Sequence, residues 1–147
     1  MDLAEKKDLN GIIIINSPIE LENKFVPFIP FISIFQKYHV KQPEDIILIT
    51  KEKRSAYDAI PLNTIIEMTK LINQLDLKKI EEPALIIQTR NDTIVNPKSA
   101  DTIFNSISSN KKEIMWLESS THGNLYEKEK RKAFEKTYEF MKENSIP

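Results

Sequence analysis

Two short apolar runs flank an amphipathic segment within residues 82–123. The runs, Ala84–Gln88 and Glu113–Leu117, have the length and apolar character of strands buried on both faces. Between them, Asn96 and Pro97 predict the start of a helix. Its apolar residues recur at helical spacing: Ala100, Ile103, Phe104 and Ile107. A strand, a helix and a second strand in this order predict parallel strands joined by a right-handed crossover.

The rest of the chain supplies further elements of the same kind. Ile12–Ile15 is a run of four β-branched residues closed by Asn, Ser and Pro, which predicts a third buried strand. Residues 2–9 favour the end of a helix, and apolar spacing predicts helices over 62–77 and about 127–142. The last of these is expected to pack through Phe134, Tyr138 and Met141. The sequence therefore predicts an α/β fold, with a short parallel sheet of about three core strands flanked by helices, in one domain over 1–147.

Residues 19–62 have a less regular pattern. Phe25, Phe28, Phe31 and Phe35 recur at helical spacing, but Pro27 and Pro30 interrupt a long helix. One interpretation is a short-helix excursion that buries its own aromatic side chains. The other is a cap whose aromatic face, with Phe25, Phe28 and Phe31, lines an apolar substrate pocket. Within this region, Ile46–Ile49 suits a strand or a helix equally well.

Composition excludes several classes of function. Basic residues (21) and acidic residues (22) nearly balance, so no positive field for nucleic acid is expected. The absence of cysteine and the presence of only two histidines argue against disulfides, thiolate zinc sites and a transition-metal centre. Two glycines are too few for a dinucleotide- or phosphate-binding loop. No apolar run reaches the ~20 residues of a membrane span, and the charged N-terminus lacks a signal-peptide core. We therefore expect a cytoplasmic protein without a cofactor or metal.

Two residues with chemical potential follow consecutive predicted strands. Asp92 comes shortly after Gln88, and His122 shortly after Leu117. Functional groups in parallel sheets gather at the carboxyl ends of the strands, and neighbouring strands lie about 4.8 Å apart, so these side chains are expected to meet. A carboxylate that orients an imidazole creates a general base for a hydroxyl nucleophile. The plainer interpretation makes Asp92 a turn residue and His122 an ordinary loop side chain.

The residues around this pair resemble the α/β-hydrolase family. P-A-L-I-I-Q (83–88), N-D-T-I-V-N-P (91–97) and W-L-E-S-S-T-H (116–122) are similar to the C-terminal half of carboxylesterases and monoacylglycerol lipases of the serine aminopeptidase-like group. The resemblance covers Gly11 to about Phe140. It implies a partial α/β-hydrolase fold with a cap-like insertion over about 19–62. It also implies Asp92 as the triad acid, His122 as the base, carboxylic esters as substrates, and Phe25, Phe28 and Phe31 beside an apolar acyl group.

The sequence departs from the family pattern in two places. Family members usually carry Gly before the histidine, where this chain has Thr121. The family's nucleophile lies in G-x-S-x-G, a strained turn that exposes the serine, and none of the ten serines here has that context. The resemblance therefore implies a chain that lacks the nucleophile elbow and is inactive alone.

Three interpretations follow from the missing nucleophile. The chain is the acid/base half of a two-part ester hydrolase, a non-catalytic α/β binding module, or a truncated gene product without function. In each case the uncharged strand Ile12–Ile15 is expected to lie at a free sheet edge, which favours self-association or pairing with a partner chain.

Overall fold

The computed structural model describes residues 1, 9–21, 24–40, 59–122 and 127–145. The helix end expected over 2–9, the ambiguous run Ile46–Ile49 and Gly123 lie outside the described residues. Contacts divide the chain into two compact units. We call Met1–Asn23 with Leu75–Pro147 the sheet unit, and Lys24–Gln74 the insert unit. The single domain and the cap boundaries expected from the sequence stay predictions.

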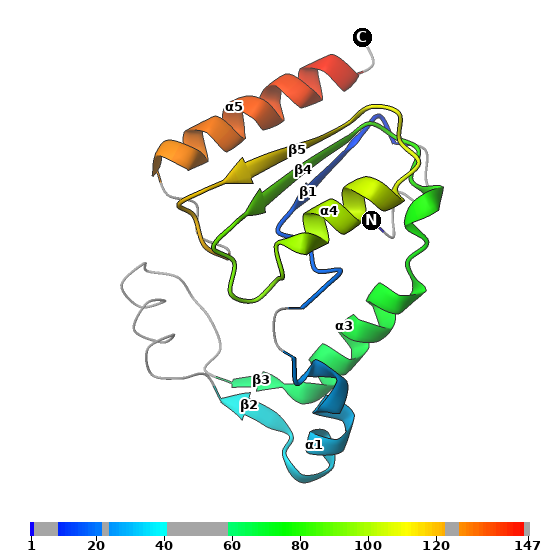
Figure 1. Cartoon of the computed structure of the whole chain (residues 1–147), viewed down its shortest axis with the longest axis vertical. Helices are drawn as coiled ribbons and strands as arrows, with labels where there is room; N and C mark the ends of the chain where they lie inside the picture. Colours follow the sequence, from blue (N-terminus) through cyan, green and yellow to red (C-terminus); the bar gives the residue numbers. More distant parts are fainter. Residues whose placement is uncertain (2–8, 22–23, 41–58, 123–126, 146–147) are drawn as a thin grey trace. The chain divides into compact units, whose positions relative to one another are not determined.

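The sheet unit is built on three parallel strands (Figure 1). They are β1 (Ile12–Ile15), β4 (Ala84–Thr89) and β5 (Lys112–Leu117), in the order β1-β4-β5. The central strand β4 is buried along its whole length, which explains its uninterrupted apolar sequence. Ile12 pairs with Ala84, and Ala84 with Lys112, so the three strands end at the same edge. The predicted α/β fold with a short parallel sheet flanked by helices is confirmed.

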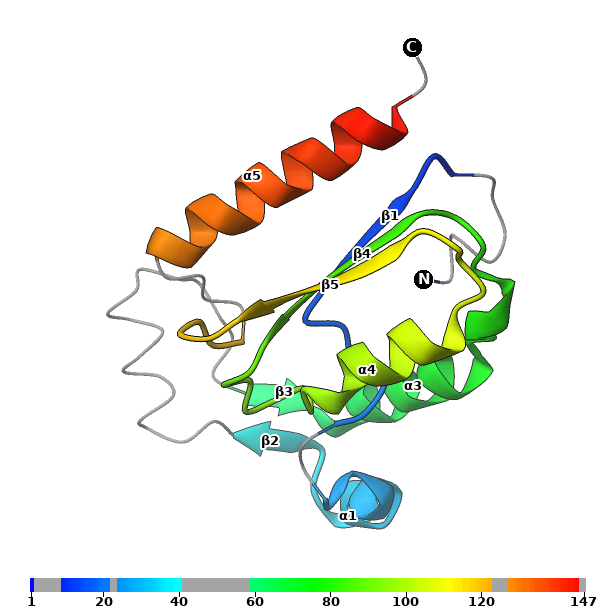
Figure 2. The ribbon, with the colours of Figure 1, turned by 45° about the horizontal axis from the view of Figure 1, so that its top comes forward.

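The two faces of the sheet are covered by different helices, as Figure 2 shows. Helix α4 (Lys98–Ser106) packs Ala100 and Ile103 against Ile86 of β4. Helix α5 (Glu127–Asn144) packs Ala133 and Phe140 on the opposite face, which carries Leu85 and Ile87. Alternate residues of a strand point to opposite faces, so a single apolar strand serves both cores. A short 3-10 turn, η2 (Leu77–Lys79), precedes β4.

The predicted packing face of α5 is wrong. Phe134, Tyr138 and Met141 are all more than half exposed, whereas Ala133 and Phe140 are buried. Both sets recur at helical spacing, so apolarity alone does not determine which one faces the sheet. The buried side chains of Ala133 and Phe140 pack with Leu85 and Ile87 in this rotation. Two exposed ion pairs accompany it: Lys136 Nζ lies 2.7 Å from Glu113 and Lys111 Nζ lies 3.4 Å from Glu143. The Phe134, Tyr138 and Met141 face is therefore a solvent-exposed flank of the helix.

We expect two phenylalanine substitutions on α5 to differ sharply in cost. Phe140→Ala opens a cavity against the sheet and should lower the free energy of unfolding by about 3–5 kcal/mol. Phe134→Ala, on the exposed flank, should change it by about 0.5 kcal/mol or less. Urea unfolding followed by far-UV circular dichroism measures both. A larger cost for Phe134→Ala than for Phe140→Ala would show that α5 rests on its other face.

The described residues of the insert unit form short helices and a small antiparallel strand pair. These elements are η1 (Val26–Phe28), α1 (Ile29–Phe35), β2 (Tyr38–Val40), β3 (Ala59–Pro61) and α3 (Leu62–Gln74). Strands β2 and β3 pair with each other, and α3 ends three residues earlier than the predicted helix. Pro27 and Pro30 lie in the first turns of η1 and α1, where a missing N–H costs nothing.

The interpretation that the insert buries its own aromatic side chains is wrong. The side chains of Phe25, Phe28, Phe31 and Phe35 are all exposed. Among the described residues of this unit, the buried apolar side chains are Ile29 and Leu62. Helix α1 has only seven residues, six of them apolar, so packing against α3 covers one side and leaves the rings of Phe31 and Phe35 in solvent.

Candidate active site

Asp92 lies in the turn that follows β4, and its side chain is fully buried. Its Oδ1 accepts hydrogen bonds from the backbone N–H groups of Ile94 (2.9 Å) and Val95 (2.8 Å). This Asx-type arrangement closes the turn. The plainer interpretation of Asp92 as a turn residue is therefore correct for one of its two oxygens, and the other oxygen remains available.

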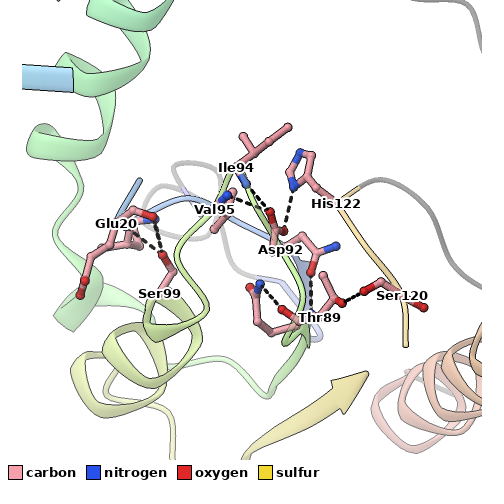
Figure 3. Close-up of polar contacts among 11 residues, drawn as sticks. Glu20, Thr89, Asp92, Ile94, Val95, Ser99, Ser120 and His122 are labelled. Carbon is pink, nitrogen blue, oxygen red and sulfur yellow. Dashed lines mark hydrogen bonds and ion pairs between the residues drawn. The ribbon is translucent and has the colours of Figure 1, made fainter. Parts of the chain in front are cut away.

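His122 meets that second oxygen. Its Nδ1 lies 2.8 Å from Asp92 Oδ2, and Figure 3 shows the other ring nitrogen turned away from the carboxylate. An ionised carboxylate only accepts, so Nδ1 carries the proton and Nε2 is left as the acceptor. One third of the His122 side chain is exposed, so the ring is accessible while its partner is buried. The two loops bring together the pair that the sequence placed at neighbouring strand ends.

Polar side chains from the β4 end hold the segment that leads to His122. The Thr89 hydroxyl donates to the Ser120 carbonyl (Figure 3), and the Asn91 amide donates to the Glu118 carbonyl at 2.6 Å. The sequence singled out none of these residues, because Thr and Asn are ordinary in loops. Their contacts arise only when β4 and β5 lie side by side.

A carboxylate from α5 binds the same segment. Glu129 accepts hydrogen bonds from the backbone N–H groups of Glu118, Ser119 and Ser120 and from the Ser120 hydroxyl. Burial raises the pKa of Glu129, but these hydrogen bonds to the charged form outweigh it, and the net pKa lies below the ordinary value. Glu129 is one of several glutamates in a charged helix, so the sequence carried no signal for it.

The arrangement has the chemistry of a general base without its nucleophile. Within the described residues, no serine, threonine or tyrosine hydroxyl hydrogen-bonds to His122. The buried Ser99 is occupied elsewhere: its hydroxyl donates to the Glu20 carbonyl and accepts from the Glu20 N–H. In the described ranges, no cluster of three or more His, Asp or Glu side chains forms a metal site.

The candidate substrate-binding phenylalanines Phe25, Phe28 and Phe31 lie on the insert unit, with their rings in solvent. They do not line the hollow of that unit, which is formed instead by α1 and α3 with residues that include Ile29, Ile65, Ile66 and Thr69. Their role in substrate binding stays a prediction.

No helix in the described part of the chain is long and apolar enough to cross a membrane.

The parallel sheet, its two helical layers and the polar groups at its carboxyl edge define part of an α/β hydrolase. The chain belongs to the family described as "Serine aminopeptidase, S33", whose model matches residues 3–129. It is 27% identical over 140 residues to a carboxylesterase of Bacillus subtilis (strain 168), covering 90% of this chain and 54% of the relative. It is 34% identical over 91 residues to the thermostable monoacylglycerol lipase of Bacillus sp. (strain H-257), covering 60% and 36% respectively.

A solved structure supports the fold. A soluble variant of monoglyceride lipase from Saccharomyces cerevisiae, in complex with a substrate analogue, superposes with a TM-score of 0.75 at 15% identity. The match covers 98% of this chain and 60% of that one. The chain therefore spans about half the length, or less, of the curated relatives it matches.

Proposed function

We propose that this chain is the C-terminal acid/base half of a serine hydrolase that cleaves carboxylic esters. The observation that carries the proposal is the hydrogen bond from His122 Nδ1 to the fully buried Asp92. The nucleophilic serine and the oxyanion donors then come from residues outside this sequence, in the same polypeptide or in a second one. Alone, the chain is inactive, because losing the serine of a triad costs roughly 10⁶ in kcat.

In the assembled site, His122 Nε2 takes the proton of the serine hydroxyl as the serine oxygen attacks the ester carbonyl carbon. Asp92 keeps the proton on Nδ1 and stabilises the positive imidazolium. The imidazolium then gives its proton to the departing alcohol as the acyl–oxygen bond breaks. A water molecule, deprotonated by His122 in turn, releases the acid and restores the serine.

The substrates proposed are short acyl esters or monoacylglycerols. Relatives named as a carboxylesterase and a monoacylglycerol lipase support this class. The exposed rings of Phe25, Phe28 and Phe31 support an apolar acyl or alkyl group, because exposed apolar side chains can form a binding face.

A chimera tests the proposal. This chain replaces the matched region of the Bacillus subtilis carboxylesterase, and the retained part of that enzyme is to supply the nucleophile. We expect the chimera to hydrolyse p-nitrophenyl acetate and this chain alone to show no hydrolysis above background. A chimera that is folded by circular dichroism but no more active than the chain alone would reject the proposal.

A second candidate function is non-catalytic binding through the sheet edge. Ile12 and Asn16 direct their N–H groups to β4, at 2.8 and 2.9 Å from the Pro83 and Ile87 carbonyls. The alternate residues Ile13 and Ile15 therefore direct their backbone N–H groups away from β4, toward the open edge of the sheet. Ile15 is 52% exposed. The outer strand β5 carries Lys112 and Glu113, charges of the kind that discourage edge pairing, whereas β1 carries none. The proposed occupant of this edge is a β-strand of a second polypeptide, either a partner or another copy.

We expect Ile15→Lys to weaken association through this edge. The chain should elute as a dimer or larger species at micromolar concentration, and the variant should shift toward the 17.1 kDa monomer, because a charge blocks a new strand neighbour. Size-exclusion chromatography with light scattering measures the mass. Ile94→Lys is the matched control, since Ile94 is equally exposed (56%) but lies in a loop. A well-behaved monomer for the unmodified chain would exclude self-association through this edge.

A further inference from the structure

The segment immediately before His122 presents three successive backbone N–H groups to one anion. Glu129, in the first turn of α5, accepts from Glu118 at 2.6 Å and Ser119 at 2.9 Å through Oε1. Its Oε2 accepts from the Ser120 N–H at 2.7 Å and from the Ser120 hydroxyl. Backbone N–H groups that converge in this way form an anion-binding nest, and here the anion belongs to the protein itself.

The opposite side of the same segment is tied to the end of β4. The carbonyls of Glu118 and Ser120 accept from Asn91 and from Thr89. Residues 118–120 are therefore held between α5 and the strand end that leads to Asp92. Ser120 is fully buried in this position, so losing the hydrogen bonds from either side would cost free energy.

We propose that Glu129 is a positioning residue that, through residues 118–120, sets the place at which the His122 ring meets Asp92. His122 follows Ser120 by two residues, so a shift of the segment moves the imidazole. The role depends on a carboxylate: a glutamine has one acceptor oxygen and would direct its NH₂ group at N–H donors. The effect of Glu129 on catalysis, through His122 as the base, rests on the proposed function.

Nuclear magnetic resonance of the full chain, labelled uniformly with ¹⁵N, tests this role without any substrate. We expect Glu129→Gln to raise the water-exchange rate of the His122 Hδ1 proton about tenfold, because a charge-assisted network that protects it is lost. The ring signals of His122 should move as well. Glu135→Gln, the matched control on the same helix, removes a carboxylate that pairs with Arg131 at the surface and should leave the His122 signals in place. Ser120→Ala, which removes one donor and keeps three, should give a smaller effect.

Backbone amides of β4, measured in the same samples, separate positioning from general destabilisation. In the expected result, Glu129→Gln leaves the exchange of the Ile86 and Ile87 amides unchanged. If Glu129→Gln accelerated exchange of these amides and of the His122 proton equally, the positioning role would be overturned. It would also be overturned if the amide signals of residues 118–120 shifted while the His122 signals stayed in place. A chimera without esterase activity would leave this measurement unaffected, so the two proposals fail independently.

Discussion

His122→Ala in the chimera with the Bacillus subtilis carboxylesterase should lower kcat for p-nitrophenyl acetate by roughly 10⁶, as removal of the histidine does in a serine protease. In the proposed mechanism the imidazole takes the serine proton. Its Nδ1 is bound to Asp92, and no side chain among the described residues hydrogen-bonds to its Nε2. Without it, the hydroxyl attacks at its own low nucleophilicity. KM should change little, because the ring is needed for proton transfer rather than for holding the acyl group.

The second histidine of the chain provides the control. His39 lies exposed on β2 of the insert unit, and His39→Ala should leave kcat within about twofold, as expected for a surface side chain without a catalytic contact. A fluorophosphonate probe reacts with an activated serine. The His122→Ala variant should therefore react with it much more slowly than the His39→Ala variant, which shows the same difference without substrate turnover. Equal activity of the two alanine variants would exclude His122 as the base.

Asp92→Asn should lower kcat by about 10⁴ while the fold stays intact, as the corresponding change does in a serine protease. The amide oxygen of asparagine can still accept from the Ile94 and Val95 N–H groups, so the turn after β4 is kept. The amide NH₂ then faces Nδ1 of His122 and favours the tautomer with its proton on Nε2. That tautomer cannot accept the serine proton.

Asp92→Ala separates the two duties of this side chain. It removes the tautomer control and also leaves two backbone N–H groups of the turn without their acceptor, so it should cost stability where the asparagine variant does not. Urea unfolding of both variants, beside steady-state kinetics, tests this difference. If asparagine and alanine unfold at the same urea concentration, the turn does not depend on Oδ1.

Asp92 and His122 illustrate how far local pattern predicts a site. Each residue follows an apolar run that forms a strand, and parallel strands in register end at one edge, so the proximity of the pair follows from the order of elements. The order of elements does not predict that the two carboxylate oxygens of Asp92 bind different partners. That difference depends on the turn geometry at Ile94 and Val95, where backbone N–H groups claim one oxygen and leave the other for the imidazole.

Helix α5 shows where local pattern fails. Phe134, Tyr138 and Met141 form a stripe as regular as that of the buried residues, and both stripes are compatible with a helix on a sheet. The buried face packs with partners distant in sequence, Leu85 and Ile87 of β4, and the ion pairs to Glu113 and Lys111 accompany the same rotation. The same rotation carries Glu129 to the segment before His122. A glutamate among many others thereby gains four hydrogen bonds.

The sequence by itself determined the three strands, their parallel direction and the proximity of Asp92 to His122. It could do so because the apolar pattern of a strand or helix is a property of that segment alone. Only the tertiary structure decided which face of α5 is buried, that the insert's aromatic rings remain in solvent, and that Glu129 holds the loop before His122. These outcomes depend on contacts between segments far apart in the chain, and the hydrophobic pattern of one segment does not specify its partners.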